Sequence, residues 1–224
     1  MPALLDSCPT QRLLITEEIS EPTRALESTR DDLLAAGFAL AAVHDSTIAA
    51  VSTIHTPQEE FQTACRWVPA LRLLRKPRYL RLRELLVELS GRATAIEEPG
   101  MTLIHRDFFA AQLLRDSETV WVVDFDTLCL GHPELDVSTF VAHLFLDGLI
   151  AGSAVAEVQQ HVGDFVEGYA QSGGRMARDR LRFYLPCALA RLGAIQLARG
   201  VSVSVVDELW ELAGGYLAGS WRLG

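Results

Sequence analysis

Cysteine and lysine are scarce in this sequence, and basic charge is not in excess. The four cysteines stand far apart, with no C-x-x-C pair, so neither a disulfide framework nor a zinc site is predicted, and reduced thiols are expected. Lys76 is the only lysine, and 20 basic residues stand against 29 acidic ones, for a formal net charge of −9. Because nucleic-acid binders normally carry a basic surface, no nucleic-acid partner is expected.

A long uninterrupted apolar run is also missing. The most apolar window, residues 137–156, contains His143 and Asp147, so it predicts a buried helix rather than a membrane span. The N-terminus lacks the basic, apolar and small-residue order of a secretory signal. These absences favour a cytoplasmic location without a membrane partner. The 224 residues, 49% of them hydrophobic, are sufficient for one well-buried core.

Helical periodicity dominates what is present. Helices are predicted over residues 23–43, from Pro57 onward, and over 71–89, 133–149, 154–170, 178–198 and 205–217, with breaks expected at Pro69 and Pro77. Strands are predicted at residues 13–16, 101–104, 112–114 and 120–123, the last two joined by the polar turn RDSET. The predicted fold class is therefore α+β and mostly α, with a small β-hairpin embedded near the middle of the chain.

Several carboxylates stand among apolar residues in the segment 103–126, LIHRDFFAAQLLRDSETVWVVDFD. Asp107 precedes the predicted hairpin and Asp124 ends it, so the antiparallel strands are expected to bring both carboxylates to one site. Gln112 adds an amide oxygen on the same side. Two carboxylates and an amide suit a hard cation such as Mg²⁺, and a carboxylate that is free of the metal can act as a base on a hydroxyl group.

An ordered set of motifs covering nearly the whole chain resembles the aminoglycoside phosphotransferase and choline kinase-like family, whose members are related to the protein kinases. HRDFFAAQ (105–112) resembles the family's H-x-D-x-x-x-x-N, VVDFD (122–126) its I-D-F segment, and GHPELD (131–136) its G-D-P-x-x-D element. RLLITEEIS (12–20) resembles the strand and hinge that hold adenine, and AAGFALAAVH (35–44) and FVEGYAQSGG (165–174) resemble two family helices. The implied fold is a protein-kinase-like C-terminal lobe whose hairpin carries the catalytic and metal aspartates.

The resemblance implies an ATP-dependent phosphotransferase, a kinase that transfers the γ-phosphoryl group of ATP to a hydroxyl of a small polar molecule. Asp107 would be the base on that hydroxyl, and His105 and Arg106 would stabilise its loop. Asp124 would bind the Mg²⁺ that bridges the ATP phosphates. Gln112 would be a second metal ligand, in the place where the family usually has asparagine.

The resemblance also implies roles for residues beside these motifs. Asp126 is a further metal candidate, with support of the site or helix capping as open alternatives. The hinge residues Thr16, Glu17 and Glu18 would bind the adenine of ATP through their backbone groups.

Two kinase elements are not found ahead of the hinge. A glycine-rich loop and a lysine strand clamp the ATP phosphates in kinases, and neither stands before RLLITEEIS. We therefore expect residues 1–22 to be a remnant of a small lobe and hinge, and residues 23–224 to form the large lobe. The 224 residues alone are expected to bind nucleotide weakly and to show little or no kinase turnover, and a homodimer or a partner is expected to cover the surface beneath the missing lobe.

Two other functions remain open at this point. A truncated and catalytically inactive pseudokinase, or an interaction module, would keep the fold without the phosphate clamp. A metal-dependent phosphohydrolase is less favoured, because paired histidines at metal-ligand spacing are not evident in the sequence.

Several further side chains have simpler expected roles. Asp136 is predicted to hydrogen-bond the catalytic loop, and His143 is predicted to pack on an apolar helix face. The acids Glu134, Asp147 and Asp164 either line a pocket for a cationic acceptor or form solvated helix faces.

Overall fold

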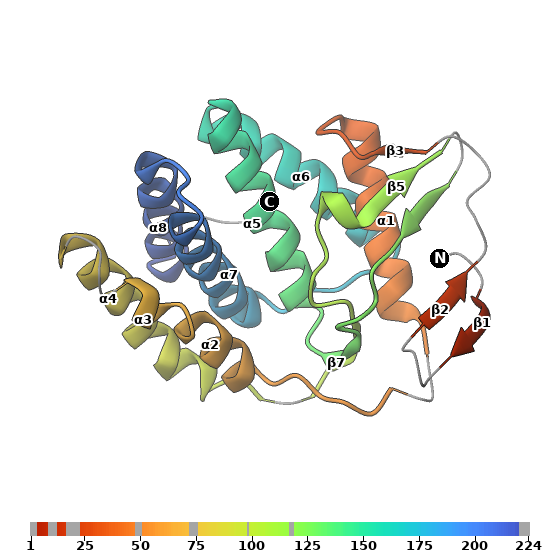
Figure 1. Cartoon of the computed structure of the whole chain (residues 1–224), viewed down its shortest axis with the longest axis horizontal. Coiled ribbons are helices and arrows are strands. Elements are labelled where there is room, and N and C mark those ends of the chain that lie inside the picture. The colour runs from red at the N-terminus through yellow and green to blue at the C-terminus, as the bar shows by residue number, and fades with distance from the viewer. Residues whose placement is uncertain are drawn as a thin grey trace.

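The computed structural model describes residues 4–8, 13–16, 23–47, 51–71, 76–97, 99–116 and 119–219. Helices make up most of this part of the chain (Figure 1). They are α1 (Arg30–Asp45), α2 (Pro57–Cys65), α3 (Val68–Leu71), α4 (Lys76–Ala93), α5 (Glu134–Ala151), α6 (Val155–Gln171), α7 (Arg178–Ala198) and α8 (Val203–Leu217). The predicted mostly helical α+β class is confirmed. Within the described ranges, no helix is both long and apolar enough to cross a bilayer.

The strands are short and form three small antiparallel sheets. β1 (Leu4–Cys8) pairs with β2 (Leu13–Thr16), β4 (Thr102–Ile104) pairs with β7 (Cys129–Gly131), and β3 (Arg24–Ala25), β5 (Leu113–Arg115) and β6 (Val120–Val122) form the third sheet. The four predicted strands are present within a residue at each end, and β5–β6 is the predicted hairpin. The prediction missed β1, β3 and β7, because strands as short as β3 and β7 offer almost no alternation to detect.

Helix α5 forms the centre of the core. Figure 1 shows it running between the α1–α6 pair and the α7–α8 pair. Its residues Val137, Phe140, Val141 and Phe145 are all at most 2% exposed, as expected of a helix packed on several sides. The apolar window 137–156 is therefore largely a buried helix, as predicted.

Helices α1 and α6 approach closely at two glycines. A Cβ on Gly37 would overlap the backbone of Phe165 and Tyr169, and a Cβ on Gly168 would overlap the backbone of Leu34. Side chains at these positions would therefore force the helices apart. This contact brings the C-terminal end of α1 against Tyr169, which matters for the site described below.

Two predicted helix boundaries differ from the structure. Helix α1 begins at Arg30 rather than Thr23, because Arg24–Ala25 pairs with β5 and Thr29 caps the helix by accepting the Asp32 N–H at 3.3 Å. Helix α4 begins at Lys76 rather than Leu71, so a helix boundary does lie beside Pro77, as expected. Pro77 is the second residue of α4, where a missing N–H costs no intrahelical hydrogen bond.

The carboxylate of Asp32 ties the β3–β5–β6 sheet to α1. It is fully buried and accepts two hydrogen bonds from Arg24 at 2.6 and 2.8 Å, one from the Glu27 N–H at 2.8 Å and one from Arg115. Burial alone would raise the pKa of Asp32, but these hydrogen bonds outweigh it and lower the pKa from 3.8 to about 2.

Replacing Asp32 with asparagine should destabilise the fold. A broken buried ion pair costs about 3–5 kcal/mol, but Arg24 is 48% exposed, so we expect about 2 kcal/mol, or a Tm lower by roughly 4–8 °C. Because the pKa is lower in the folded state, this stabilisation is present above about pH 4 and is lost as the pH falls towards 2. Thermal melts of wild type, Asp32→Asn and the exposed neighbour Asp31→Asn at pH 7 and pH 3 check this. Equal Tm values for all three at pH 7 would contradict it.

Candidate active site

The catalytic loop predicted at residues 105–112 follows β4. His105 is fully buried, and its Nε2–H donates to the Val123 carbonyl oxygen at 2.9 Å. The Thr127 hydroxyl donates to the carbonyl oxygen of His105 at 2.6 Å. His105 thus joins the loop after β4 to the segment after β6, which carries Asp124.

Asp136, at the start of α5, holds the backbone of this loop. Its Oδ2 accepts the His105 N–H and its Oδ1 accepts the Arg106 N–H, both at 2.7 Å. The prediction that Asp136 hydrogen-bonds the catalytic loop is confirmed. Asp136 is itself fully buried, so it depends on these donors and on one further partner for its stability.

That further partner is His44, at the end of α1. Its Nε2 lies 3.1 Å from Asp136 Oδ2, and its Nδ1 lies 2.8 Å from the Tyr169 hydroxyl. Burial, with the nearby acids Glu134 and Asp136, raises the pKa of Tyr169 well above its usual range, so the phenol keeps its proton. The Asp136 carboxylate can only accept, so His44 donates from Nε2, and Nδ1 of the neutral ring then accepts from the Tyr169 hydroxyl. The close α1–α6 packing thus supports the catalytic loop through a buried chain of hydrogen bonds.

Two non-glycine residues of the site have left-handed backbone. Arg106 has a φ of 71° and Asp124 a φ of 62°, a conformation that costs about 1 kcal/mol or more for a residue with a Cβ. The Arg106 N–H is held by Asp136, and the carbonyl before Asp124 is held by His105. The hydrogen bonds around the loop therefore maintain the strained backbone of Arg106, which precedes Asp107, and of Asp124.

Gln112 and Asp124 are in contact. The Gln112 side-chain amide donates to Asp124 Oδ2 at 3.2 Å, and the Val123 N–H donates to the Gln112 carbonyl at 3.0 Å. Asp124 is exposed and Gln112 is partly exposed, while Asp126 is exposed two residues further on. Among the described residues, no three His, Cys, Asp or Glu side chains gather closely enough to hold a metal alone. The oxygen donors present suit Mg²⁺, which completes its shell with water and phosphate oxygens.

Asp107 lines a cleft of about 160 Å³ between the catalytic loop, α5 and α7. The other lining residues are Phe109, Thr139, Ala142, His143, Ala188, Arg191, Leu192, Ile195, Gln196 and Arg199. Asp124 and Gln112 are not part of this lining. Asp107 is therefore the carboxylate that a molecule in the cleft would meet, and the Gln112–Asp124 pair flanks the β5–β6 hairpin.

Sequence reasoning missed most of the polar groups in this cleft. His143 was assigned to packing, and its ring does stack on Phe109, with ring centres 4.4 Å apart and an angle of 18°, but it also faces the cleft. Arg191, Gln196 and Arg199 were not singled out. Their spacing along α7 follows one helical face, and this periodicity was the available signal.

The three acids considered either as a pocket for a cationic acceptor or as solvated helix faces lie elsewhere in the structure. Glu134 is buried, not solvated, and accepts the Ala177 N–H at 2.6 Å. Asp164 pairs with Arg30, and Asp147 is exposed on α5. None of the three lines the cleft beside Asp107.

The predicted hinge is described only in part. Thr16 ends β2 and lies opposite Leu4 of β1. Glu17 and Glu18 lie outside the described residues.

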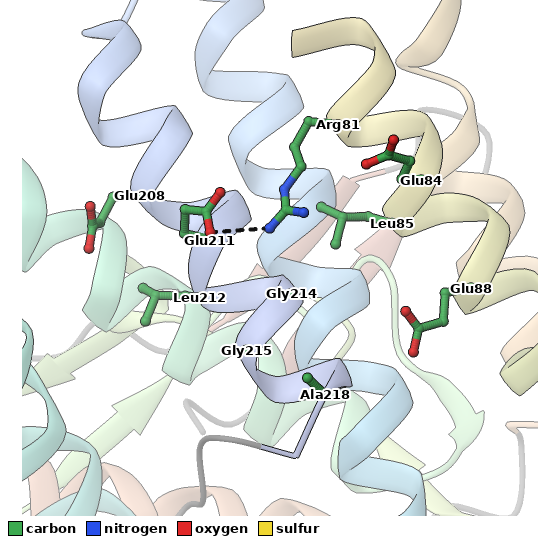
Figure 2. Close-up of a pocket in the computed structure, with 10 residues that line it drawn as sticks. All are labelled: Arg81, Glu84, Leu85, Glu88, Glu208, Glu211, Leu212, Gly214, Gly215 and Ala218. Atoms are coloured by element: carbon green, nitrogen blue, oxygen red, sulfur yellow. Dashed lines mark ion pairs between the residues drawn. The ribbon is translucent and has the colours of Figure 1, made fainter. Parts of the chain in front are cut away.

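A larger groove lies elsewhere, between α4 and α8. It encloses about 620 Å³ and is lined by Arg81, Glu84, Glu88, Glu208 and Glu211 among others. Figure 2 shows Arg81 reaching Glu211 across the groove, at 3.2 Å. No residue of the catalytic loop or the hairpin lines it, so its size alone does not make it the candidate site.

Comparison with known proteins shows the family of the chain. Residues 12–184 match the APH family, described as the phosphotransferase enzyme family. The chain belongs to this phosphotransferase family, which confirms the predicted resemblance and the predicted enzyme class. No curated protein matches the chain by sequence.

Solved structures of small-molecule kinases share the fold. A choline/ethanolamine kinase family protein from Mesorhizobium loti is 18% identical with a TM-score of 0.66, covering 96% of this chain and 74% of its own. Choline kinase LicA from Streptococcus pneumoniae is 13% identical with a TM-score of 0.62, covering 97% and 74%. The spectinomycin phosphotransferase APH(9)-Ia, solved with ADP and spectinomycin, is 15% identical with a TM-score of 0.55, covering 93% and 67%. At these identities the similarity shows the fold.

Proposed function

We propose that this chain transfers the γ-phosphoryl group of ATP to a hydroxyl group of a small polar molecule. The observation that carries the proposal is the position of Asp107, which lines the cleft at the end of a loop held by Asp136. Membership of the phosphotransferase family supports the reaction class. Among the solved relatives, the spectinomycin phosphotransferase forms a complex with ADP and LicA one with AMP, which favours a nucleotide as the donor.

Asp107 would act on the acceptor. The acceptor hydroxyl in the cleft donates a hydrogen bond to the Asp107 carboxylate, and its oxygen attacks the γ-phosphorus. The bond from that phosphorus to the bridging oxygen breaks, ADP leaves, and the hydroxyl proton passes to Asp107. The loop hydrogen bonds of His105 and Arg106 hold the carboxylate in place and make both positioning residues in this proposal.

Asp124 and Gln112 would hold Mg²⁺, with Asp126 as a further candidate ligand. When bound, Mg²⁺ would neutralise charge on the ATP phosphates. The Gln112–Asp124 hydrogen bond keeps the two side chains together before any cation is bound. In the same proposal, residues 1–22 belong to the hinge region, where the backbone of Thr16, Glu17 and Glu18 would hold adenine, and residues 23–224 form the large lobe.

A thermal-shift experiment tests the metal and nucleotide part of this proposal. ATP with Mg²⁺ should raise the Tm of the wild type more than ATP alone, because a ligand that binds the native state stabilises it by mass action. At 100 times the Kd this is about 2.7 kcal/mol, or roughly 5–10 °C for a chain of this size. Asp124→Asn should lose the increment due to Mg²⁺, whereas the exposed control Asp147→Asn should keep it. Equal increments in wild type and Asp124→Asn would exclude Asp124 as a ligand.

A further inference from the structure

The charges in the cleft beside Asp107 are mainly positive. Its lining contains two arginines, Arg191 and Arg199, and Asp107 is its one carboxylate. If Asp107 acts on the acceptor hydroxyl, the rest of the acceptor meets guanidinium groups. A cationic acceptor would bring a third positive charge to this confined space, where like charges repel more strongly than in water.

Arg191 is fixed at the wall of the cleft. Its Nε lies 3.3 Å from Glu60 Oε1, and Glu60 is buried and also bound by His55 at 3.0 Å. This ion pair offsets part of the charge of Arg191, but a planar guanidinium has further N–H donors beyond Nε–H. The pair therefore orients the group and leaves donors for a ligand.

Arg199 is more exposed to solvent than Arg191. It is exposed and follows the last residue of α7. A cation at a helix C-terminus suits the helix dipole, and this accounts for one arginine in that place. It does not account for Arg191, which lies within the helix, on the same face and lining the same cleft.

His143 lines the same cleft as the two arginines. Burial, followed by Arg191 and Arg199, lowers the pKa of His143 from 6.5 to about 4. The ring is therefore neutral near pH 7 and can donate or accept one hydrogen bond at each nitrogen without adding charge.

The size and lining of the cleft favour a compact acceptor. Its volume of about 160 Å³ is below the roughly 300–1,000 Å³ typical of sites for drug-sized ligands. Recognition of a quaternary ammonium uses exposed aromatic faces, but here Phe109 is stacked against His143. The buried Gln196 adds a neutral polar group.

We propose that the acceptor carries an anionic group, a carboxylate or a phosphate, which Arg199 and Arg191 bind while its hydroxyl meets Asp107. This inference rests on the proposed function and names its substrate class. It differs from the cationic acceptor considered for Glu134, Asp147 and Asp164, because none of these acids lines the cleft whereas two arginines do. Charged groups elsewhere on the surface are largely screened at this site.

A binding experiment with four small hydroxyl compounds tests the inference. It uses the full chain in the presence of Mg²⁺ and a non-hydrolysable ATP analogue. The probes are D-glycerate, sn-glycerol 3-phosphate, glycerol and choline, and ligand-observed NMR measures their Kd. At least one of the two anions should bind tenfold or more tightly than glycerol and choline, and comparison of the two anions distinguishes carboxylate from phosphate. Arg199→Gln should weaken anion binding by roughly tenfold or more, since hydrogen bonds to charged groups are the stronger ones.

A matched control is Arg182→Gln, the same change at an exposed arginine on the same helix outside the cleft. It should leave anion binding unchanged. Choline bound as tightly as the anions, equal anion affinity in wild type and Arg199→Gln, or no binding of either anion would each overturn the inference.

The same compounds in a phosphoryl-transfer assay separate this inference from the function on which it rests. Transfer to choline or glycerol, with no preference for an anion, would overturn the inference and leave the proposed function intact. Anion binding that depends on Arg199, without transfer to any compound, would support the anion site and overturn the proposed function.

Discussion

Asp107→Asn should lower the rate of phosphoryl transfer by roughly 10²–10⁴-fold, the usual contribution of a general base. Asparagine keeps the size of the side chain but cannot take the proton of the acceptor hydroxyl. Asp107 is only half-buried, so the fold does not depend on its charge. The Tm should therefore stay within about 1 °C of the wild type, as for most surface substitutions.

Initial rates with labelled ATP, measured alongside circular-dichroism melts, check both parts. Asp147→Asn, an exposed carboxylate on α5, is the control and should keep full activity. A rate for Asp107→Asn within threefold of the wild type would remove Asp107 from the chemistry.

Asp136→Asn should damage both stability and activity. Oδ2 of Asp136 accepts from His105 and His44, and Oδ1 accepts from Arg106. An asparagine has one oxygen, so its amide must face at least one of these N–H groups, which is then buried without an acceptor. We expect a loss of about 3 kcal/mol and a Tm lower by roughly 6–12 °C.

The activity should fall for a different reason. Arg106 has a strained backbone and directly precedes Asp107, so a released Arg106 N–H lets the loop relax and moves the Asp107 carboxylate. A misplacement of about 1 Å can cost roughly 100-fold in rate. Melts and rates of Asp136→Asn at a temperature well below its Tm separate the two effects. Wild-type rates at that temperature would show that the loop does not need Asp136 for positioning.

The long helices could be predicted because each has two or more turns of repeating apolar residues, a signal that tertiary structure does not override. The start of α1 could not, because Arg24–Ala25 is extended only through pairing with Leu114 and Arg115, which are far away in sequence. Nor could β7, since its three residues are a strand only beside β4. Local patterns do not contain these long-range pairings.

The candidate site, like the fold, could be predicted from the sequence only in part. The contact between Gln112 and Asp124 and the hold of Asp136 on the loop before Asp107 could be expected from the motifs, because these residues lie in one segment with characteristic spacing. The opposite wall of the cleft comes from α5 and α7, which are separated in sequence, and the packing of the two helices decides which residues share it. Glu134 was expected on a solvated face, but it is buried because the segment before α7 covers it and donates the Ala177 N–H.

The fate of the γ-phosphoryl group is the most direct test of the account. The full chain, in excess over [γ-³²P]ATP and with Mg²⁺, is incubated with a pool of small hydroxyl compounds that includes the four probes above. The account predicts label in a phosphomonoester, formed together with ADP and lost in both Asp107→Asn and Asp124→Asn. Label found only in inorganic phosphate, as from a phosphohydrolase, or ATP left intact, as with a pseudokinase, would contradict it.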